Sequence, residues 1–286
     1  MPEAAVDRAV SRILRTKLAF ALRDAADTYP PEKIACPEHT RLAWEVACKS
    51  MVLLKNENRV LPLDRTKIKR IAVLGRLAGK ANLGDKGSSL VRPPYAVTPL
   101  EGIRNRAGNE IAVLSYTGRS LEKARRIAAR ADVTVIVAGL TGREEGEYFP
   151  RIRGGDRLDL GLGEHDQALI KAVCGQGSPC VVVLEGGSAI TMEGWKDAVD
   201  AILMAWYPGM EGGNALADIL FGNVNPGGRL PVTFFESADQ LFAFDKTARR
   251  VTYDHYHGYR YADFKKIRPA FYLGFGLSYT GFSYAD

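Results

Sequence analysis

Three glutamates lie close together in one polar segment of the sequence, residues 141–160. Glu144, Glu145 and Glu147 stand in TGREEGEYFPRIRGGDRLDL, which also holds Arg157 and three further arginines. A carboxyl group in such surroundings can have its pKa tuned for proton transfer, and its neighbours can contact the hydroxyl groups of a ligand. The alternative interpretation is a solvated, charged loop without a chemical role.

A second segment with polar side chains is NLGDKGSSLVRPPYAVTPLEGI, residues 82–103. Lys86, Ser88, Ser89 and Arg92 could reach a ligand, because this segment also leaves the carboxyl end of a predicted strand. The alternative is that its glycines only make turns. A phosphate loop is not indicated, since the GxxxxGK[ST] spacing is absent.

The remaining titratable groups give weaker signals. Glu185 directly follows a buried strand, where it could be a binding carboxylate or a hydrogen-bonded structural residue. His255 and His257 are one residue apart, but a metal site would need further ligands and none is apparent. We therefore expect no metal site.

The four cysteines form no CxxC pair, and their spacing suits no zinc site. They stand at positions 36, 48, 174 and 180. We expect buried or free thiols in a reducing compartment. The first 17 residues lack an apolar h-region and a cleavage site, so we expect a cytoplasmic chain, unless a signal peptide exists upstream.

Composition excludes two classes of protein. The 286 residues are 46% hydrophobic, enough for a substantial core, yet no apolar run reaches eighteen residues, so no membrane span is predicted. The formal charge of +6 comes from scattered Lys and Arg without a basic stripe. Nucleic-acid binding is therefore not indicated.

The elements that must position the polar segments alternate along the chain. Apolar, β-branched runs predict strands, and 3.6-residue periodicity predicts helices between them. The predicted strands are 70–74, 110–115, 133–140, 180–184, 201–205 and 230–234; the predicted helices are 99–107, 121–131, 164–174 and 212–221, with a short helical piece at 195–199. Continuous apolar strands alternating with helices predict an α/β fold, a mostly parallel sheet sandwiched between helices.

The two ends of the chain differ from this pattern. An amphipathic helix is predicted over 4–23, a proline-containing linker over 24–37, and a second helix over 39–54. Residues 250–286 are dense in aromatic side chains and are expected to wrap the domain edge. We expect a boundary after residue 37, giving a short helical segment (1–37) and an α/β domain (38–286).

Several long motifs, in order, resemble glycoside hydrolase family 3, the β-glucosidase family. They include SMVLLKNENRVLPL (50–63), LEGGSAITM (184–192), AILMAWYPGMEGGNALADILFGNVNPGGRLPVTFFES (201–237) and FYLGFGLSYTGF (271–282). The resemblance covers residues 4–286. It implies the family's C-terminal α/β sandwich and a carbohydrate substrate, a terminal β-D-glucoside, with no cofactor.

The resemblance also implies a role for the acidic segment, where the family carries its general acid/base glutamate. Here Glu145-Gly146 precedes Asp156-Arg157, so Glu145 is the first choice, Glu147 the main competitor and Glu144 the third. Retaining glycosidases need this acid and a second carboxylate as nucleophile, about 5–5.5 Å apart.

The family's nucleophile is an aspartate on a (β/α)8 barrel that precedes the sandwich, and no matching motif occurs in this sequence. The resemblance therefore implies an acid/base-bearing domain that hydrolyses a glucoside only with a barrel partner. The alternative is a non-catalytic carbohydrate-binding or assembly module, or an inactive remnant of the same fold.

Overall fold

The computed structural model describes residues 2–21, 30–84, 87, 89–147, 157, 159–242, 245 and 247–283. The chain forms two compact units, Met1–Arg41 and Leu42–Asp286. No helix in the described ranges is both long enough and apolar enough to cross a membrane.

The first unit is helical. Helix α1 spans Glu3–Ala21, close to the predicted 4–23, and none of its residues is buried. A 3-10 turn, η2 (Pro31–Lys33), precedes α2 (Pro37–Ser50), which continues into the second unit. Pro31 and Pro37 each stand at a first helical position, where the missing N–H has no cost.

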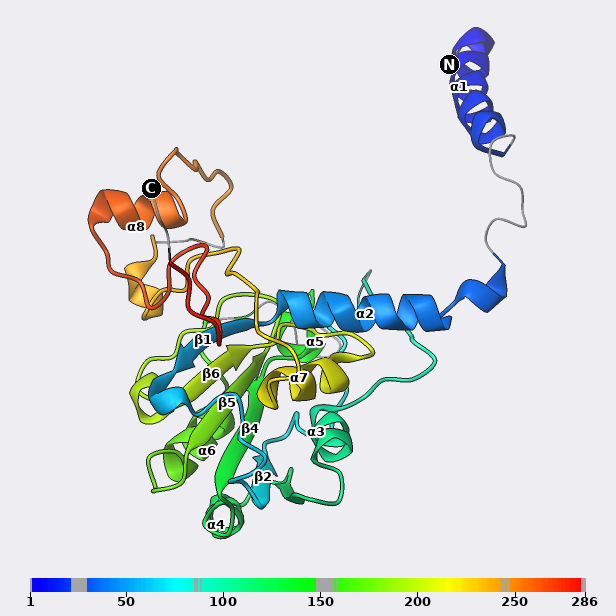
Figure 1. Cartoon of the computed structure of the whole chain (residues 1–286). Helices are drawn as coiled ribbons and strands as arrows, with labels where there is room; N and C mark the ends of the chain where they lie inside the picture. Colours follow the sequence, from blue (N-terminus) through cyan, green and yellow to red (C-terminus); the bar gives the residue numbers. More distant parts are fainter. Residues whose placement is uncertain are drawn as a thin grey trace. The chain divides into compact units, whose positions relative to one another are not determined.

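The described part of the second unit contains one six-stranded sheet (Figure 1). Its strands are β1 (Val52–Asn56), β2 (Arg70–Leu74), β3 (Ala112–Tyr116), β4 (Val133–Gly139), β5 (Cys180–Glu185) and β6 (Ala201–Met204). Their order is β1-β6-β5-β4-β2-β3, and every neighbouring pair is parallel except β1 with β6. The predicted mostly parallel α/β fold is confirmed.

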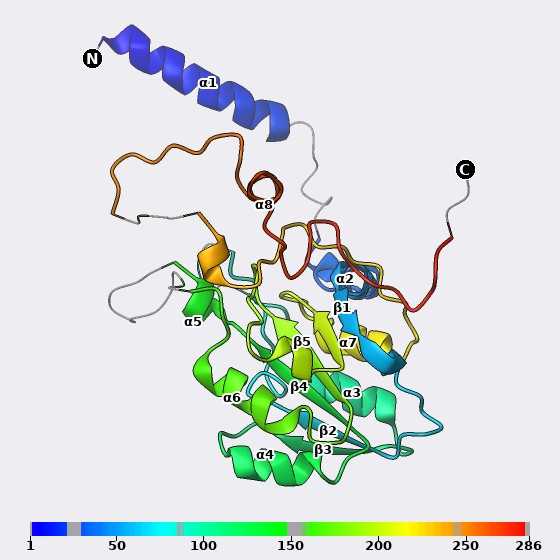
Figure 2. The ribbon, with the colours of Figure 1, turned by 90° about the vertical axis from the view of Figure 1, so that its left-hand side faces the viewer.

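Helices cover both faces of this sheet, as Figure 2 shows. Helices α3 (Pro99–Ala107) and α7 (Gly212–Leu220) lie on one face with α2; α4 (Leu121–Ala128) and α6 (Glu164–Val173) lie on the other. Each face of the sheet has its own hydrophobic core, and successive strand residues point to opposite faces. Val73 packs into the core on the side of α3 and α7, and Leu74 packs into the core on the side of α4 and α6. Burial on both sides explains why these strands are continuously apolar.

Two predicted elements differ from the structure. The helix predicted to Leu54 ends at Ser50, and β1 begins at Val52, because Val52–Asn56 pairs with β6 and the apolar run Met51–Leu54 is buried. The strand predicted at 230–234 is an irregular segment with one bridge, Phe234 to Phe271. Pro231 lacks a backbone donor, which interrupts the ladder there.

The remaining helical turns are short. They are η3 (Glu57–Arg59), α5 (Gly142–Glu145), η4 (Lys196–Ala198), η5 (Ala238–Gln240) and α8 (Tyr259–Lys265). Of these, α5 matters for the site because it follows β4 directly.

The expectation of free thiols is wrong for two cysteines. Cys174, just after α6, and Cys180, the first residue of β5, form a disulfide with a Cα–Cα distance of 5.4 Å. The short α6–β5 connection brings the two residues together, which spacing alone does not indicate. Cys36 and Cys48 are free.

Candidate active site

The acidic segment begins as a helical turn at the carboxyl end of β4. Thr141 caps α5 by accepting from the Arg143 N–H, and Glu144 closes a capping box by accepting from the Thr141 N–H at 2.9 Å. Burial disfavours ionised Glu144, but the Thr141 hydrogen bonds and the nearby Arg76 charge outweigh it, so the pKa of Glu144 is lowered. Glu144 is thus held as a carboxylate that stabilises its own helix.

Glu145 is held by four hydrogen-bond donors, three of which come from the segments after β5 and β6. Its Oε2 accepts from the Tyr207 hydroxyl at 2.6 Å and from the Gly187 N–H at 2.5 Å. Its Oε1 accepts from the Ser188 hydroxyl at 2.8 Å and from Arg157 Nη1 at 3.1 Å. The side chain of Glu145 is 10% exposed, so it is largely buried but still accessible to solvent.

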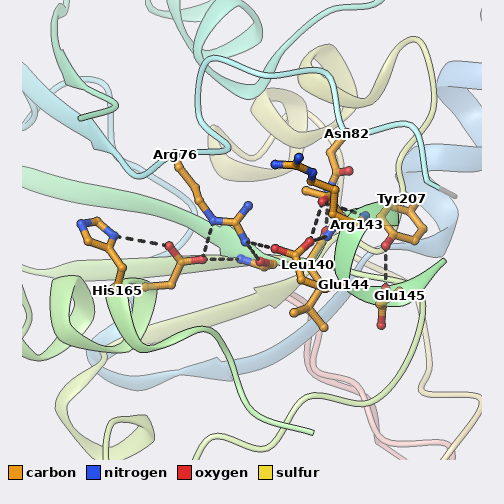
Figure 3. Close-up of polar contacts among 11 residues, drawn as sticks. Arg76, Asn82, Leu140, Arg143, Glu144, Glu145, His165 and Tyr207 are labelled. Atoms are coloured by element: carbon orange, nitrogen blue, oxygen red, sulfur yellow. Dashed lines mark hydrogen bonds and ion pairs between the residues drawn. The ribbon is translucent and has the colours of Figure 1, made fainter. Parts of the chain in front are cut away.

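Tyr207 belongs to the segment after β6 and points toward Glu145 in Figure 3. Burial raises the pKa of the Tyr207 phenol well above its ordinary value, and the hydrogen bond to Glu145 and the charge of Glu145 add to this. Tyr207 therefore stays a neutral donor throughout the working pH range. It fixes the orientation of the carboxyl group without adding charge.

These residues meet because parallel strands end at the same edge of the sheet. Glu145 follows β4, Ser188 follows β5 and Tyr207 follows β6, three neighbouring strands. Side chains after the carboxyl ends of such strands converge on one crevice, the usual ligand position in open α/β sheets.

Of the three predicted substrate-binding residues that the structure describes, Arg157 is the one that contacts Glu145. Arg157 also donates to Ser188 Oγ at 2.7 Å and to the Ala189 carbonyl at 3.0 Å. Ser89 and Arg92 are exposed in the segment after β2, and the structure records no contact between them and Glu145. Lys86 and Ser88 lie outside the described residues.

Glu147, the main competitor of Glu145, is exposed. The residues that follow it, 148–156, lie outside the described residues.

Sequence reasoning missed Tyr207, Ser188 and Gly187. Both motifs that contain them, WYPG and LEGGS, follow predicted buried strands, and that position was the available signal. The glycines and the proline in these motifs predict turns, but they do not predict that the polar side chains beside them contact Glu145.

A second carboxyl group, Glu185, lies at the end of β5 and is 1% exposed. Burial raises the pKa of Glu185 to about 8, against the opposing effects of an Asn82 hydrogen bond and the Arg76 charge. Its Oε2 has no hydrogen-bond partner among the described residues. Asn82 in turn donates to the Leu140 carbonyl at 2.8 Å and joins the β2 and β4 segments.

No group of His, Cys, Asp and Glu residues in the described ranges could hold a metal ion. His257 Nδ1 lies 2.8 Å from the Asp254 carbonyl oxygen, and the His255 ring packs edge-on to Tyr256. These contacts give both histidines local structural partners.

The fold and this hydrogen-bonded cluster define an α/β domain with a fixed carboxyl group at the carboxyl edge of its sheet. Residues 51–279 match the family model described as the glycosyl hydrolase family 3 C-terminal domain. The chain therefore belongs to glycoside hydrolase family 3 and carries its C-terminal domain.

Named relatives agree with this assignment. Thermostable beta-glucosidase B of Acetivibrio thermocellus is 37% identical, in a match that covers all of this chain and 38% of that protein. A beta-xylosidase of Formosa agariphila is 34% identical, in a match that covers 98% of this chain and 40% of that protein. The crystal structure of beta-D-glucoside glucohydrolase from Trichoderma reesei superposes with a TM-score of 0.87 at 29% identity, covering all of this chain and 43% of that one. The chain thus spans about two-fifths of the length of these relatives.

Proposed function

We propose that this chain is the acid/base-bearing part of a retaining, exo-acting β-glucosidase-like hydrolase. The observation that supports this most directly is the Glu145 cluster, a carboxyl group fixed by four donors at the carboxyl edge of a family 3 domain. Terminal β-D-glucosides are the proposed substrates. The nucleophile, an aspartate, comes from a (β/α)8 barrel, and residues 1–37 are proposed to be the end of that barrel region.

In this proposal Glu145 transfers one proton in each of two steps. In the first, its carboxylic acid protonates the glycosidic oxygen while the barrel aspartate attacks the anomeric carbon, so the alcohol leaves and a glycosyl–enzyme ester forms. In the second, the Glu145 carboxylate takes a proton from water, whose oxygen displaces the aspartate and releases the sugar. Both steps balance without a cofactor.

As a carboxylate, Glu145 accepts from all four partners, and in the acid form its proton takes the place of one donor while the other partners keep the orientation of the group. Tyr207 and Gly187 fix Oε2, and Ser188 and Arg157 fix Oε1. Positioning within a fraction of an ångström contributes strongly to such proton transfers. Arg157 acts mainly through Glu145, while Lys86, Ser88, Ser89 and Arg92 remain proposed substrate contacts.

Geometry also ranks the competing glutamates. Glu144 is the weakest candidate, because its carboxylate caps its own helix and its lowered pKa favours the ionised form. Glu147 is exposed and keeps its place as the main alternative.

The decisive experiment measures hydrolysis of β-glucosides by this chain, alone and with a barrel polypeptide encoded beside it. Two substrates separate the roles: a dinitrophenyl glucoside, whose leaving group needs little protonation, and an alkyl glucoside, whose leaving group needs a proton. Glu145→Gln should abolish alkyl glucoside cleavage and spare the first step with the dinitrophenyl substrate.

Two controls complete the design. Glu147→Gln should keep both activities; if it alone shows the leaving-group dependence, the acid is Glu147. Glu122→Gln, on the exposed face of α4, is the matched surface variant. The glycosidase proposal fails if no barrel restores hydrolysis of either substrate.

The second candidate is a non-catalytic carbohydrate-binding or assembly module. The observation that favours it is the Glu145 carboxyl group itself, whose two oxygens already accept from four donors of this domain, as those of a structural carboxylate do. Glucoside binding that persists in Glu145→Gln, with no turnover in the presence of the barrel, would support this role.

A further inference from the structure

The helix that carries Glu145 is too short to hold itself in place. Helix α5 is a single turn, Gly142–Glu145, and an isolated turn of helix has little stability of its own. Glu145 is its last residue, so the position of the carboxyl group depends on the contacts that fix α5. Polar contacts at the end of β4 and at Glu144 supply part of this support.

Arg76, in the segment after β2, contacts the chain on both sides of the start of α5. Its Nη2 donates to the carbonyl of Gly139, the last residue of β4, and lies 3.5 Å from Glu144 Oε1 in α5. The other oxygen of Glu144, Oε2, accepts from Thr141 in the capping box. Arg76 and Glu144 point toward each other in Figure 3. One guanidinium group therefore joins the end of the strand to the helix that carries Glu145.

Asp166, in the first turn of α6, fixes the orientation of Arg76. Its side chain is 2% exposed, and its Oδ2 accepts from Arg76 Nε at 3.3 Å. The same oxygen accepts from the Gly139 N–H at 3.3 Å. A guanidinium group is planar and carries its donors in a rigid fork, so acceptors on two of its nitrogens set its plane. The Arg76 group that faces Glu144 is thus held in advance.

Two further contacts hold the strand end that Arg76 binds. Asn82 donates to the Leu140 carbonyl at 2.8 Å, and the Leu140 N–H donates to the Glu185 carbonyl at 2.8 Å. Gly139 has a φ of +152°, and a Cβ there would overlap the Glu185 carbonyl oxygen. These contacts fix Gly139 and Leu140, and Arg76 connects this fixed end to α5.

The support of Glu145 therefore comes from both neighbours of β4. Strand β4 lies between β2 and β5 in the sheet. The segment after β5 supplies Gly187 and Ser188, which bind the carboxyl group itself. The segment after β2 supplies Arg76, which binds the helix through Glu144. Two-sided support restricts both the carboxyl group and the backbone that carries it.

We propose that Arg76 is a positioning residue for the Glu145 carboxyl group and acts through the Gly139 carbonyl and Glu144. This rests on the proposed function, in which Glu145 is the acid/base. A displacement of α5 by a fraction of an ångström would misdirect the carboxyl group, and proton transfer depends steeply on such geometry.

The first test needs neither a barrel nor a substrate. The Gly187 N–H donates to Glu145 Oε2, so its hydrogen exchange in the full chain reports whether the carboxyl group is in place. Arg76→Gln, which cannot bridge the same acceptors, should speed exchange of the Gly187 amide at least about tenfold. The amides of α3, on the opposite face of the sheet, should keep their wild-type rates. Arg126→Gln, exposed on α4, is the matched control and should change neither.

The second test uses the two glucosides of the hydrolysis assay with the barrel present. Arg76→Gln should lower kcat/KM for the alkyl glucoside at least about tenfold more than for the dinitrophenyl glucoside, because only the first leaving group needs a proton. Arg76→Lys keeps the charge but not the fork of donors, so it should recover only part of the loss. A merely structural role would lower both kcat/KM values by the same factor.

The positioning role of Arg76 is overturned if the Gly187 amide of Arg76→Gln exchanges as in the wild type. It is also overturned if the α3 amides accelerate as much as Gly187, or if both glucosides lose kcat/KM equally. Failure of the proposed function has a different signature. If Glu145→Gln shows no leaving-group dependence, Glu145 is not the acid, whereas the exchange rates still decide whether Arg76 holds its carboxyl group.

Discussion

Replacing Glu185 by glutamine should remove a large pH dependence from the stability of the domain. Burial raises the pKa of Glu185 from 4.5 to about 8 in the folded chain, so the folded state keeps a proton that the unfolded state releases. A folded state that binds more protons loses stability as pH rises. The contribution is fully present below pH 4.5 and is lost progressively as the pH rises toward 8.

The magnitude follows from the pH interval. Each pH unit over which only the unfolded chain has lost the proton changes the free energy of unfolding by about 1.4 kcal/mol. From pH 4.5 to 7, Glu185 should therefore lower that free energy by about 3 kcal/mol. A buried glutamine has no such proton, so Glu185→Gln should escape this loss.

The assay is urea unfolding followed by tryptophan fluorescence between pH 4.5 and 8. The quantity of interest is the difference in free energy of unfolding between Glu185→Gln and the wild type, because other titrating groups cancel in it. Between pH 4.5 and 7, the free energy of unfolding of Glu185→Gln should rise by about 3 kcal/mol relative to that of the wild type. Glu193→Gln, at an exposed position, is the matched control and should give a flat difference.

A flat difference for Glu185→Gln would show that Glu185 ionises in the folded chain as it does in the unfolded one. A difference that shifts in favour of the wild type with rising pH would mean that the folded state stabilises the carboxylate. Either result would refute the assignment of Glu185 as a buried neutral acid.

Three further outcomes are expected. Gly102→Ala should destabilise the domain by at least about 2 kcal/mol in urea unfolding, since its Cβ would overlap a backbone carbonyl of α7; Gly227→Ala, which has open space, should change stability by less than about 0.5 kcal/mol. Replacing Cys174 and Cys180 by alanine should cost about 2 kcal/mol by chain entropy, and equal stability of the variant would contradict this. Burial raises the pKa of the Cys48 thiol to about 11, so mass spectrometry should find Cys48 unmodified by iodoacetamide at pH 8 until the chain is unfolded.

Much of the α/β pattern was predictable because buried parallel strands have a strong local signature. The runs at 70–74 and 133–140 predict strands, and the structure has them at Arg70–Leu74 and Val133–Gly139. The predicted helix over 39–54 runs too far because no glycine or proline separates α2 from β1. Only pairing with β6 distinguishes Val52–Asn56 from a last helical turn.

The site was predictable only in part, for a physical reason. The segment that holds Glu145 stands out through its charges, and its position after a strand favours a functional role. The residues that hold Glu145 lie far along the chain: Ser188 is 43 positions away and Tyr207 is 62. Such contacts depend on which strands become neighbours, and that order is a property of the whole sheet.

The C-terminal segment has a consequence for how the molecule meets its own copies. Strand β1 ends the sheet, and its Leu53 carbonyl accepts from the Leu277 N–H at 2.8 Å. An uncovered outermost strand offers backbone groups that recruit strands from other molecules and promote aggregation. Here Leu277 of the C-terminal segment pairs with part of β1. Fewer backbone groups of this edge strand are then available to strands of other molecules.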